Sequence, residues 1–186
     1  MRNESGYNKD KSSVNLSCRI GKTEYDLLLI DSRKKGISLN SYVNSIIKRY
    51  LSWERYAEEV GFIPLSKRAT MQIFDKLNER SINEIAADVG QTVPRELTML
   101  MFNKLDFSSV MSMIEITSAR VGVLRHNIMG SKHNFTLYHG VNKKFSQYVA
   151  RVFESMGEDL SIKLKVSHVN KNILSVEVEE LGNVLD

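Results

Sequence analysis

Hydrophobic and polar residues alternate strictly between residues 14 and 20, in the stretch VNLSCRI. A repeat of two residues predicts a β-strand with one buried and one exposed face. The two faces would be Val14, Leu16, Cys18 and Ile20 on the buried side, and Asn15, Ser17 and Arg19 on the exposed side. No second strand pattern follows nearby, and an isolated strand is unstable in water. We therefore expect this strand to pair with the same strand of a second copy of the chain.

The pattern then changes to helical spacing. Apolar residues three and four positions apart predict a helix over Glu24–Lys35, with Thr23 as its N-cap and Gly36 as its C-terminal stop. Ser38 is a second N-cap, followed by a strongly apolar helix from about residue 39 to residue 52. The first fifty residues thus predict a strand followed by two helices.

Residues 53–118 carry further helical patterns, interrupted by glycine, proline and capping residues. The second helix should continue to about Gly61 and end before Pro64. Four short helices are expected after it: 67–77 capped by Ser66, 81–90 opened by the capping box of Ser81 and Glu84 and closed by Gly90, 95–105 after Val93-Pro94, and 107–118 capped by Asp106.

The last third of the chain alternates again with a period of two. We expect strands at 119–128, 133–139, 160–169 and 173–180, with a helix over 141–156 that Gly157 ends. This order predicts a β-β-α-β-β antiparallel sheet with one covered face. The fold class is therefore α+β. Its expected parts are an arm over 1–12, a strand-helix-helix domain over 13–52, a helical connector over 53–118 and a sheet domain over 119–186.

Net charge becomes informative when it is divided along the chain. The 186 residues carry 26 Lys and Arg against 22 Asp and Glu, a net charge of +4. Residues 1–51 hold ten of these cations and five of the acids, whereas the remainder is close to neutral. Such asymmetry indicates that the first quarter of the chain faces a polyanion.

Composition removes several classes of protein. With 42% hydrophobic and 26% charged residues the chain is typical of a globular protein. No apolar run reaches the roughly 18–20 residues of a membrane span. Because Cys18 is the only cysteine, an internal disulfide and a cysteine-based zinc site are both excluded. The first residues lack the apolar core of a secretory signal, so we expect a cytoplasmic protein.

The text VNLSCRI followed by GISLNSYVNSIIKRYL resembles the ribbon-helix-helix family of DNA-binding repressors. The resemblance covers residues 13–52, and Gly21 stands where many members of the family have proline. It implies a homodimer whose paired strands enter the major groove of double-stranded DNA. The residues that match the base-reading positions of the family are Asn15, Ser17 and Arg19.

The resemblance also implies that the start of the second helix contacts the DNA backbone. Free N–H groups at a helix N-terminus bind phosphate well, and nearby lysines add charge without reading sequence. The expected phosphate contacts are Ser38, Leu39, Asn40, Lys9, Lys11 and Lys22.

The second domain carries no motif of an enzyme, so we expect no catalytic residue and no cofactor. Its histidines His126, His133 and His139 cluster on one predicted hairpin. Nickel-responsive repressors with the same N-terminal module bind metal through His and Cys, but a cysteine in this domain and their ligand spacing are missing, so no metal site is expected.

Three hypotheses for the function follow from these residues. The leading one is a homodimeric transcription regulator with a C-terminal regulatory, ligand-sensing or oligomerisation domain. The alternative is an antitoxin-type autorepressor whose C-terminal half binds a protein partner, although such tails are often short and disordered until bound. The third is a ligand sensor in which a small-molecule effector or a metal bound by the second domain shifts the affinity for DNA. The pairing of dimers into tetramers also stays open at this stage.

Overall fold

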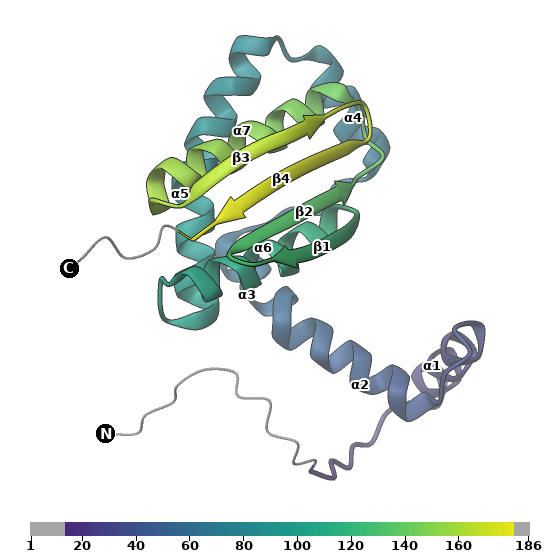
Figure 1. Ribbon diagram of the computed structural model, residues 1–186. Coiled ribbons are helices and arrows are strands. Elements are labelled where there is room, and N and C mark those ends of the chain that lie inside the picture. Colours follow the sequence, from purple (N-terminus) through teal and green to yellow (C-terminus); the bar gives the residue numbers. More distant parts are fainter. Residues whose placement is uncertain (1–13, 181–186) are drawn as a thin grey trace, which may run out of the picture. The chain divides into compact units, whose positions relative to one another are not determined.

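The computed structural model describes residues 14–180, and the chain divides into two compact units, Met1–Arg55 and Tyr56–Asp186 (Figure 1). Within the described residues it is a mixed helical and sheet structure, in which six α-helices precede an antiparallel sheet in the second half and a further helix, α7, lies between the two strand pairs of that sheet. The α+β class predicted from the sequence is therefore confirmed. None of the helices within residues 14–180 is long and apolar enough to span a membrane.

The first unit is built from two helices joined by a tight turn. Helix α1 covers Lys22–Lys34 and α2 covers Leu39–Arg49, and a π-helical stretch, η1, continues over Tyr50–Glu54. Gly36 has a φ of +66°, and its N–H donates to the carbonyl of Arg33 while the N–H of Ile37 donates to Ser32. This is the turn expected of a C-terminal glycine.

Two details of the first unit differ from the sequence prediction. Residues 14–20 form no strand within the single chain, since no described segment pairs with them. Helix α1 begins two residues earlier than predicted, with Gly21 rather than Thr23 as its N-cap. Gly21 has an extended ψ of 156°, and its carbonyl accepts the N–H of Tyr25, which lets the helix start without a side-chain cap.

The second unit consists of five helices around a four-stranded sheet. The elements are α3 (Arg55–Val60), α4 (Lys67–Lys76), α5 (Glu79–Phe102), α6 (Phe107–Val121), β1 (Val123–Met129), β2 (Lys132–Tyr138), α7 (Lys143–Leu160), β3 (Lys163–Val169) and β4 (Ile173–Glu179). The strands lie in the order β1-β2-β4-β3, and every neighbouring pair is antiparallel.

Helix α5 replaces two of the four short helices that the sequence predicted. It starts at the N-cap Asn78, whose side chain accepts the N–H of Ser81, and runs through both Gly90 and Pro94. Gly90 is buried against α7, where an added Cβ would lie 2.6 Å from the carbonyl oxygen of Val152. This glycine permits close helix packing instead of ending a helix.

Two boundaries in the sheet domain also differ from the sequence prediction. Helix α6 extends to Val121, so the first strand starts at residue 123 and not at 119. Helix α7 continues through Gly157 to Leu160 and ends at Ser161, which has a φ of 52°. Gly157 is buried against β3, since an added Cβ would lie 3.0 Å from the Cβ of Leu164. Gly90 and Gly157 therefore both allow close packing inside a helix, and neither ends one.

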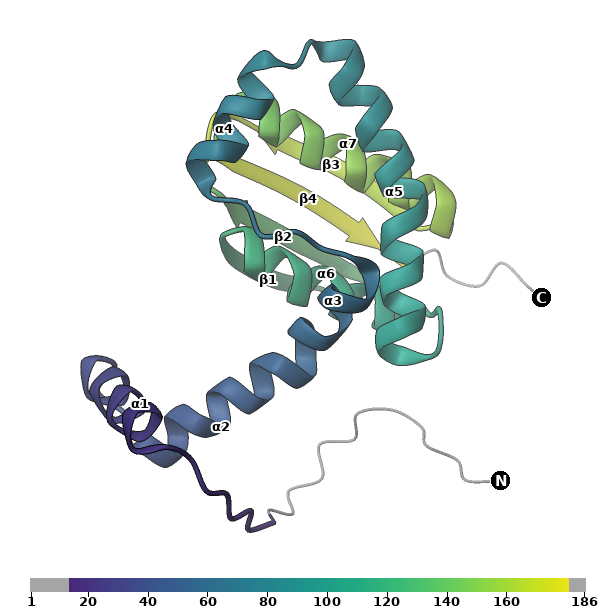
Figure 2. The ribbon, with the colours of Figure 1, turned by 180° about the vertical axis from the view of Figure 1, so that it is seen from behind.

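The core of the second unit lies between the sheet and its helices. Figure 2 shows α5, α6 and α7 in front of the sheet, while the opposite face of the sheet is open in Figure 1. The buried apolar residues of the sheet are Phe135, Leu137, Leu174, Val176 and Val178, and those of the helices include Ile82, Ala86, Leu97, Val110, Ile114 and Met156. Helix α7 contacts β3 and β4, α6 contacts β1, and α5 packs on α7. The predicted sheet with one covered face is thus present.

Candidate nucleic-acid interface

The residues expected to read bases lie on one exposed segment. Asn15, Ser17 and Arg19 are all exposed in the stretch that leads into α1. The apolar residues between them are exposed as well, with Val14 at 91% and Leu16 at 81% of their full surface. Cys18 is also exposed, so no residue within 14–180 covers the predicted buried face of this segment.

The start of α2 is a capped helix N-terminus at the surface. The hydroxyl of Ser38 accepts the N–H of Ser41 at 3.1 Å and donates to the hydroxyl of Ser41 at 2.8 Å. The N–H groups of Leu39 and Asn40 have no acceptor inside the helix, as is general for a first turn. Asn40 is exposed and Leu39 is half-buried. These two amides suit an anion such as a phosphate group.

Three lysines were expected to add phosphate contacts. Lys9 and Lys11 lie outside the described residues. Lys22 is in the first turn of α1, where its ammonium forms an ion pair with Asp26 and lies 5.7 Å from the ring of Tyr25. Because this pair offsets the charge of Lys22, its attraction for a polyanion is reduced.

Lys35 is not among the phosphate contacts predicted from the sequence, and the structure places its side chain beside Tyr42 of α2. Its ammonium lies 5.8 Å from the centre of the Tyr42 ring, in the first turn of that helix. The sequence signal for this position is the run of three cations, Arg33, Lys34 and Lys35, near the end of α1. Lys35 is therefore a further candidate for a contact with the phosphate backbone.

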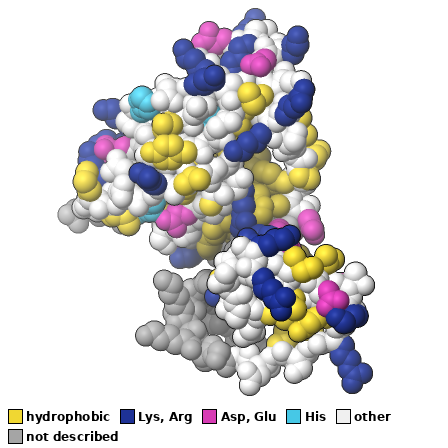
Figure 3. Space-filling view, turned by 90° about the vertical axis from the view of Figure 1, so that its right-hand side faces the viewer, with side chains coloured by type: hydrophobic (Ala, Val, Ile, Leu, Met, Phe, Trp, Pro, Cys, Tyr) yellow, Lys and Arg dark blue, Asp and Glu magenta, His cyan; other side chains and the backbone are white. Residues whose placement is uncertain are grey.

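The first unit exposes most of its apolar side chains. Ser32 alone is buried among residues 14–55. The exposed hydrophobic residues of this unit are Val14, Leu16, Ile20, Tyr25, Leu27, Ile30, Ile37, Ile47, Tyr50 and Leu51. In Figure 3 hydrophobic side chains lie at the surface of this part of the molecule among Lys and Arg side chains. An exposed apolar surface of this kind indicates a protein interface.

The histidines of the second unit form two separate arrangements. His126 contacts Glu115 through Nδ1, and its Nε2 lies 2.9 Å from Nδ1 of His133. The His126 ring also stacks on Phe135 with centroids 4.1 Å apart. Burial, followed by the neighbouring His126, lowers the pKa of His133. Among the described residues no three His, Cys, Asp or Glu side chains form a group suited to a metal ion.

His139 is a buried structural residue. Its Nδ1 accepts the N–H of Val141 at 3.1 Å, which leaves Nε2 to donate to the hydroxyl of Ser146 at 2.7 Å. The Ser146 hydroxyl in turn donates to the carbonyl of Asn170 at 2.5 Å. Burial, and secondarily the charge of Lys67, lower the pKa of His139. This histidine joins β2, α7 and the β3–β4 turn in its neutral form.

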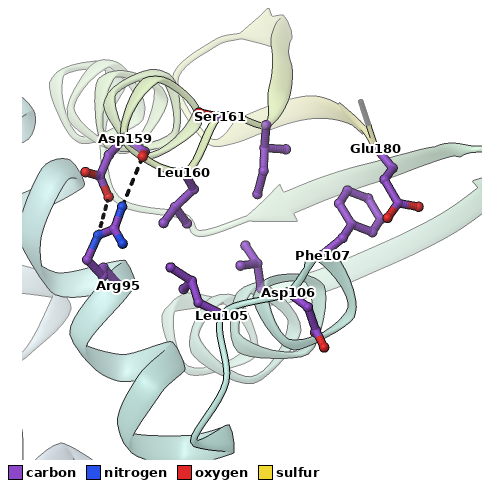
Figure 4. Close-up of a pocket in the computed structure, with 10 residues that line it drawn as sticks. Arg95, Leu105, Asp106, Phe107, Asp159, Leu160, Ser161 and Glu180 are labelled. Atoms are coloured by element: carbon purple, nitrogen blue, oxygen red, sulfur yellow. Dashed lines mark hydrogen bonds and ion pairs between the residues drawn. The ribbon is translucent and has the colours of Figure 1, made fainter. Parts of the chain in front are cut away.

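A cavity of about 330 Å³ opens between α5, α6 and the end of α7 (Figure 4). Leu105, Phe107 and Leu160 supply its apolar lining. Its cation is already paired, because Arg95 Nε lies 2.9 Å from the Asp159 carboxylate and Nη2 donates to the Asp159 carbonyl at 3.1 Å. This cavity can accept a small apolar group, but it offers no unpaired cation to an anionic ligand.

No protein-family model matches the chain, and no curated protein matches it either.

Proposed function

We propose that the protein is a homodimeric, sequence-specific regulator of transcription that binds double-stranded DNA through its first unit. The observation that carries this proposal is that most apolar side chains in residues 14–55 are exposed and none is buried, beside an alternating polar and cationic segment. A helical pair with only Ser32 buried cannot be held by its own core. A second copy of the same unit supplies the missing apolar surface.

The alternating segment acquires a function in such a dimer. When two copies of residues 14–20 pair antiparallel, Val14, Leu16 and Ile20 all point to one face of the ribbon. That face can cover the exposed apolar residues of α1 and α2. The opposite face carries Asn15, Ser17 and Arg19, and a two-stranded ribbon fits the major groove.

The proposed contacts divide into two kinds. Arg19 can donate two hydrogen bonds to guanine, and Asn15 can pair with adenine, so these side chains would specify sequence. The free amides of Leu39 and Asn40, with Lys35, would hold the phosphate backbone and fix the orientation of the dimer. The second unit, which has its own core, would regulate or assemble the bound dimers. A prefolded unit of this kind fits regulation better than the antitoxin alternative.

The substitution Arg19→Ala tests this proposal. Duplexes selected from a random pool by the wild-type protein should share a palindromic motif, because a two-fold dimer reads two half-sites. Because a homodimer carrying Arg19→Ala loses one contact in each half-site, its affinity for that motif should fall by about thirtyfold or more, in line with about 1–3 kcal/mol for each bidentate contact to a base. Binding is measured by fluorescence anisotropy, and the dimer by sedimentation.

The matched control is Arg80→Ala, which removes an exposed arginine from α5 in the second unit. This control should retain the affinity and the motif. Selection of no common motif, or equal affinity of Arg19→Ala and wild type for the motif, would overturn the proposed function.

A further inference from the structure

The sheet of the second unit has two edges that differ in their protection. The order β1-β2-β4-β3 places β1 at one edge and β3 at the other. A strand at the edge of a sheet presents unpaired N–H and C=O groups that can pair with another chain. Native proteins usually block such pairing with lysines, bulges or proline.

The β3 edge carries two of these protections. Lys163 and Lys165 stand on its exposed face, and Lys163 forms an ion pair with Glu179 at 2.7 Å. The register of β3 against β4 is interrupted between Val166 and His168. Such a bulge twists an edge away from further pairing.

The β1 edge has no lysine, proline or bulge, and four of its seven residues are apolar. Its seven residues pair with β2 without interruption, and Arg125 is their single full charge. Val123, Ile128 and Met129 are exposed to 66%, 60% and 67% of their surface. We propose that β1 is an interface, and that it pairs antiparallel with β1 of a second copy of the chain.

The sequence of β1 is complementary to itself in one register. Pairing over the full strand centres the two-fold axis on His126, the middle residue of Val123–Met129. Val123 then lies opposite Met129 of the second copy, and Leu124 opposite Ile128. These pairs join apolar side chains on the same face, which is the arrangement that stabilises neighbouring strands.

Charge selects the same register. With the axis on His126, Arg125 lies opposite the neutral Asn127. Moving the axis by one residue to Arg125 would set two arginines directly opposite each other, which is unfavourable, and would place Val123 against Asn127. A strand complementary to its own antiparallel copy identifies the occupant as this chain, and the two sheets would become one sheet of eight strands.

Disulfide trapping in the full chain tests the interface. In a Cys18→Ser background, one tagged copy carries Arg125→Cys and a second, differently tagged copy carries Asn127→Cys. Residues directly opposite each other in antiparallel strands have Cα atoms about 4.5–5.5 Å apart, within the range of a disulfide. After co-expression and mild oxidation, the two tags should be found together in most of the cross-linked chains.

The matched control uses Lys165→Cys and Ser167→Cys, which stand two residues apart on the other edge strand. This pair should cross-link at least tenfold more slowly than the β1 pair. Equal rates at the two edges, or no cross-link at β1, would overturn the proposal. Because the readout involves no DNA, adding Arg19→Ala to the β1 cysteine pair should leave its cross-linking rate unchanged, which separates this proposal from the proposed function.

A charge exchange tests the register on exposed side chains that can change without disturbing the core. In the β1 cysteine pair, Val123→Lys with Met129→Lys puts two lysines opposite each other and should slow cross-linking at least tenfold. Val123→Lys with Met129→Glu puts opposite charges together and should restore the rate. Equal rates for the two double variants would show that these residues do not face each other.

Discussion

At the scale of single residues, His139 makes the stability of the second unit depend on pH. Its ring accepts from Val141 and donates to Ser146, so protonation of Nδ1 would break the first of these bonds. Its pKa is lowered in the fold by burial, and the unfolded chain therefore binds the proton at a higher pH than the folded chain does. The free energy of unfolding therefore decreases as the pH falls through the range in which an unperturbed histidine gains its proton.

We therefore expect the free energy of unfolding to decrease between about pH 7 and pH 5, where an unperturbed histidine gains its proton. In His139→Gln this decrease should be smaller, even where the variant is less stable at every pH. The measurement is urea unfolding at several pH values. His168→Gln, at an exposed position on β3, is the control and should retain the wild-type slope. An unchanged slope in His139→Gln would contradict the assignment.

Gly90, Pro94 and Gly157 show which residue-level predictions fail without the structure. The sequence predicts the start or end of a helix at each of these residues, and each lies within a helix. Glycine and proline disfavour helix interiors, so a helix boundary is the expected outcome at each of these residues when only the local sequence is considered. The close approach of Val152 to Gly90 and of Leu164 to Gly157 depends on tertiary contacts that local sequence does not encode.

At the scale of elements, three of the five predicted N-caps are confirmed, whereas Gly21 replaces Thr23 and Asn78 replaces Ser81. Ser38, Ser66 and Asp106 each accept an N–H from three residues ahead, as their positions predicted. Such a bond joins neighbours in the chain and so needs no information about distant contacts. The strand expected over residues 14–20 is the opposite case, because its partner must come from another part of the fold or from another chain.

Asp106 provides the prediction at this scale. Its carboxylate accepts the N–H of Ser109 at 2.8 Å and pairs with Lys104 at 2.7 Å, and these contacts hold its pKa far below the usual range. Asp106→Ala should destabilise the second unit by about 1 kcal/mol through loss of the cap of α6. Asp106→Asn keeps an oxygen that can accept the same bond, so it should lose less.

The test is chemical unfolding near neutral pH, monitored by the helical circular dichroism. A folded-state pKa below the unfolded value means that the contribution of Asp106 is present above about pH 4 and is lost as pH falls towards the folded pKa. The difference between wild type and Asp106→Ala should therefore persist down to that pH. Equal decreases in the free energy of unfolding in Asp106→Ala and Asp106→Asn would show that the charge of Asp106 stabilises the unit and that its cap of α6 does not.

At the scale of the whole molecule, the two units differ in how they are stabilised. The second unit buries residues from α5, α6, α7 and the sheet in one core. The first unit buries Ser32 alone among residues 14–55. If the proposed function is right, this unit is stabilised by association with a second chain. Anything that binds only the folded form raises the apparent stability, and a second chain acts in this way.

Thermal unfolding should therefore depend on protein concentration. Over a hundredfold range of chain concentration, the midpoint of a transition that includes α1 and α2 should rise with concentration, as mass action requires. Leu16→Asp puts a charge on the apolar face of the proposed ribbon and should shift that transition to lower temperature. Asn15→Asp, on the opposite face, is the matched control and should shift it much less.

The double variant Val123→Lys with Met129→Lys separates the two proposed interfaces in the same experiment. If residues 14–55 associate independently of β1, the concentration dependence should persist in this variant and disappear in Leu16→Asp. A midpoint that is independent of concentration in the wild type would contradict a dimer held by the first unit, because an isolated helical pair with this exposed surface has no other source of stability.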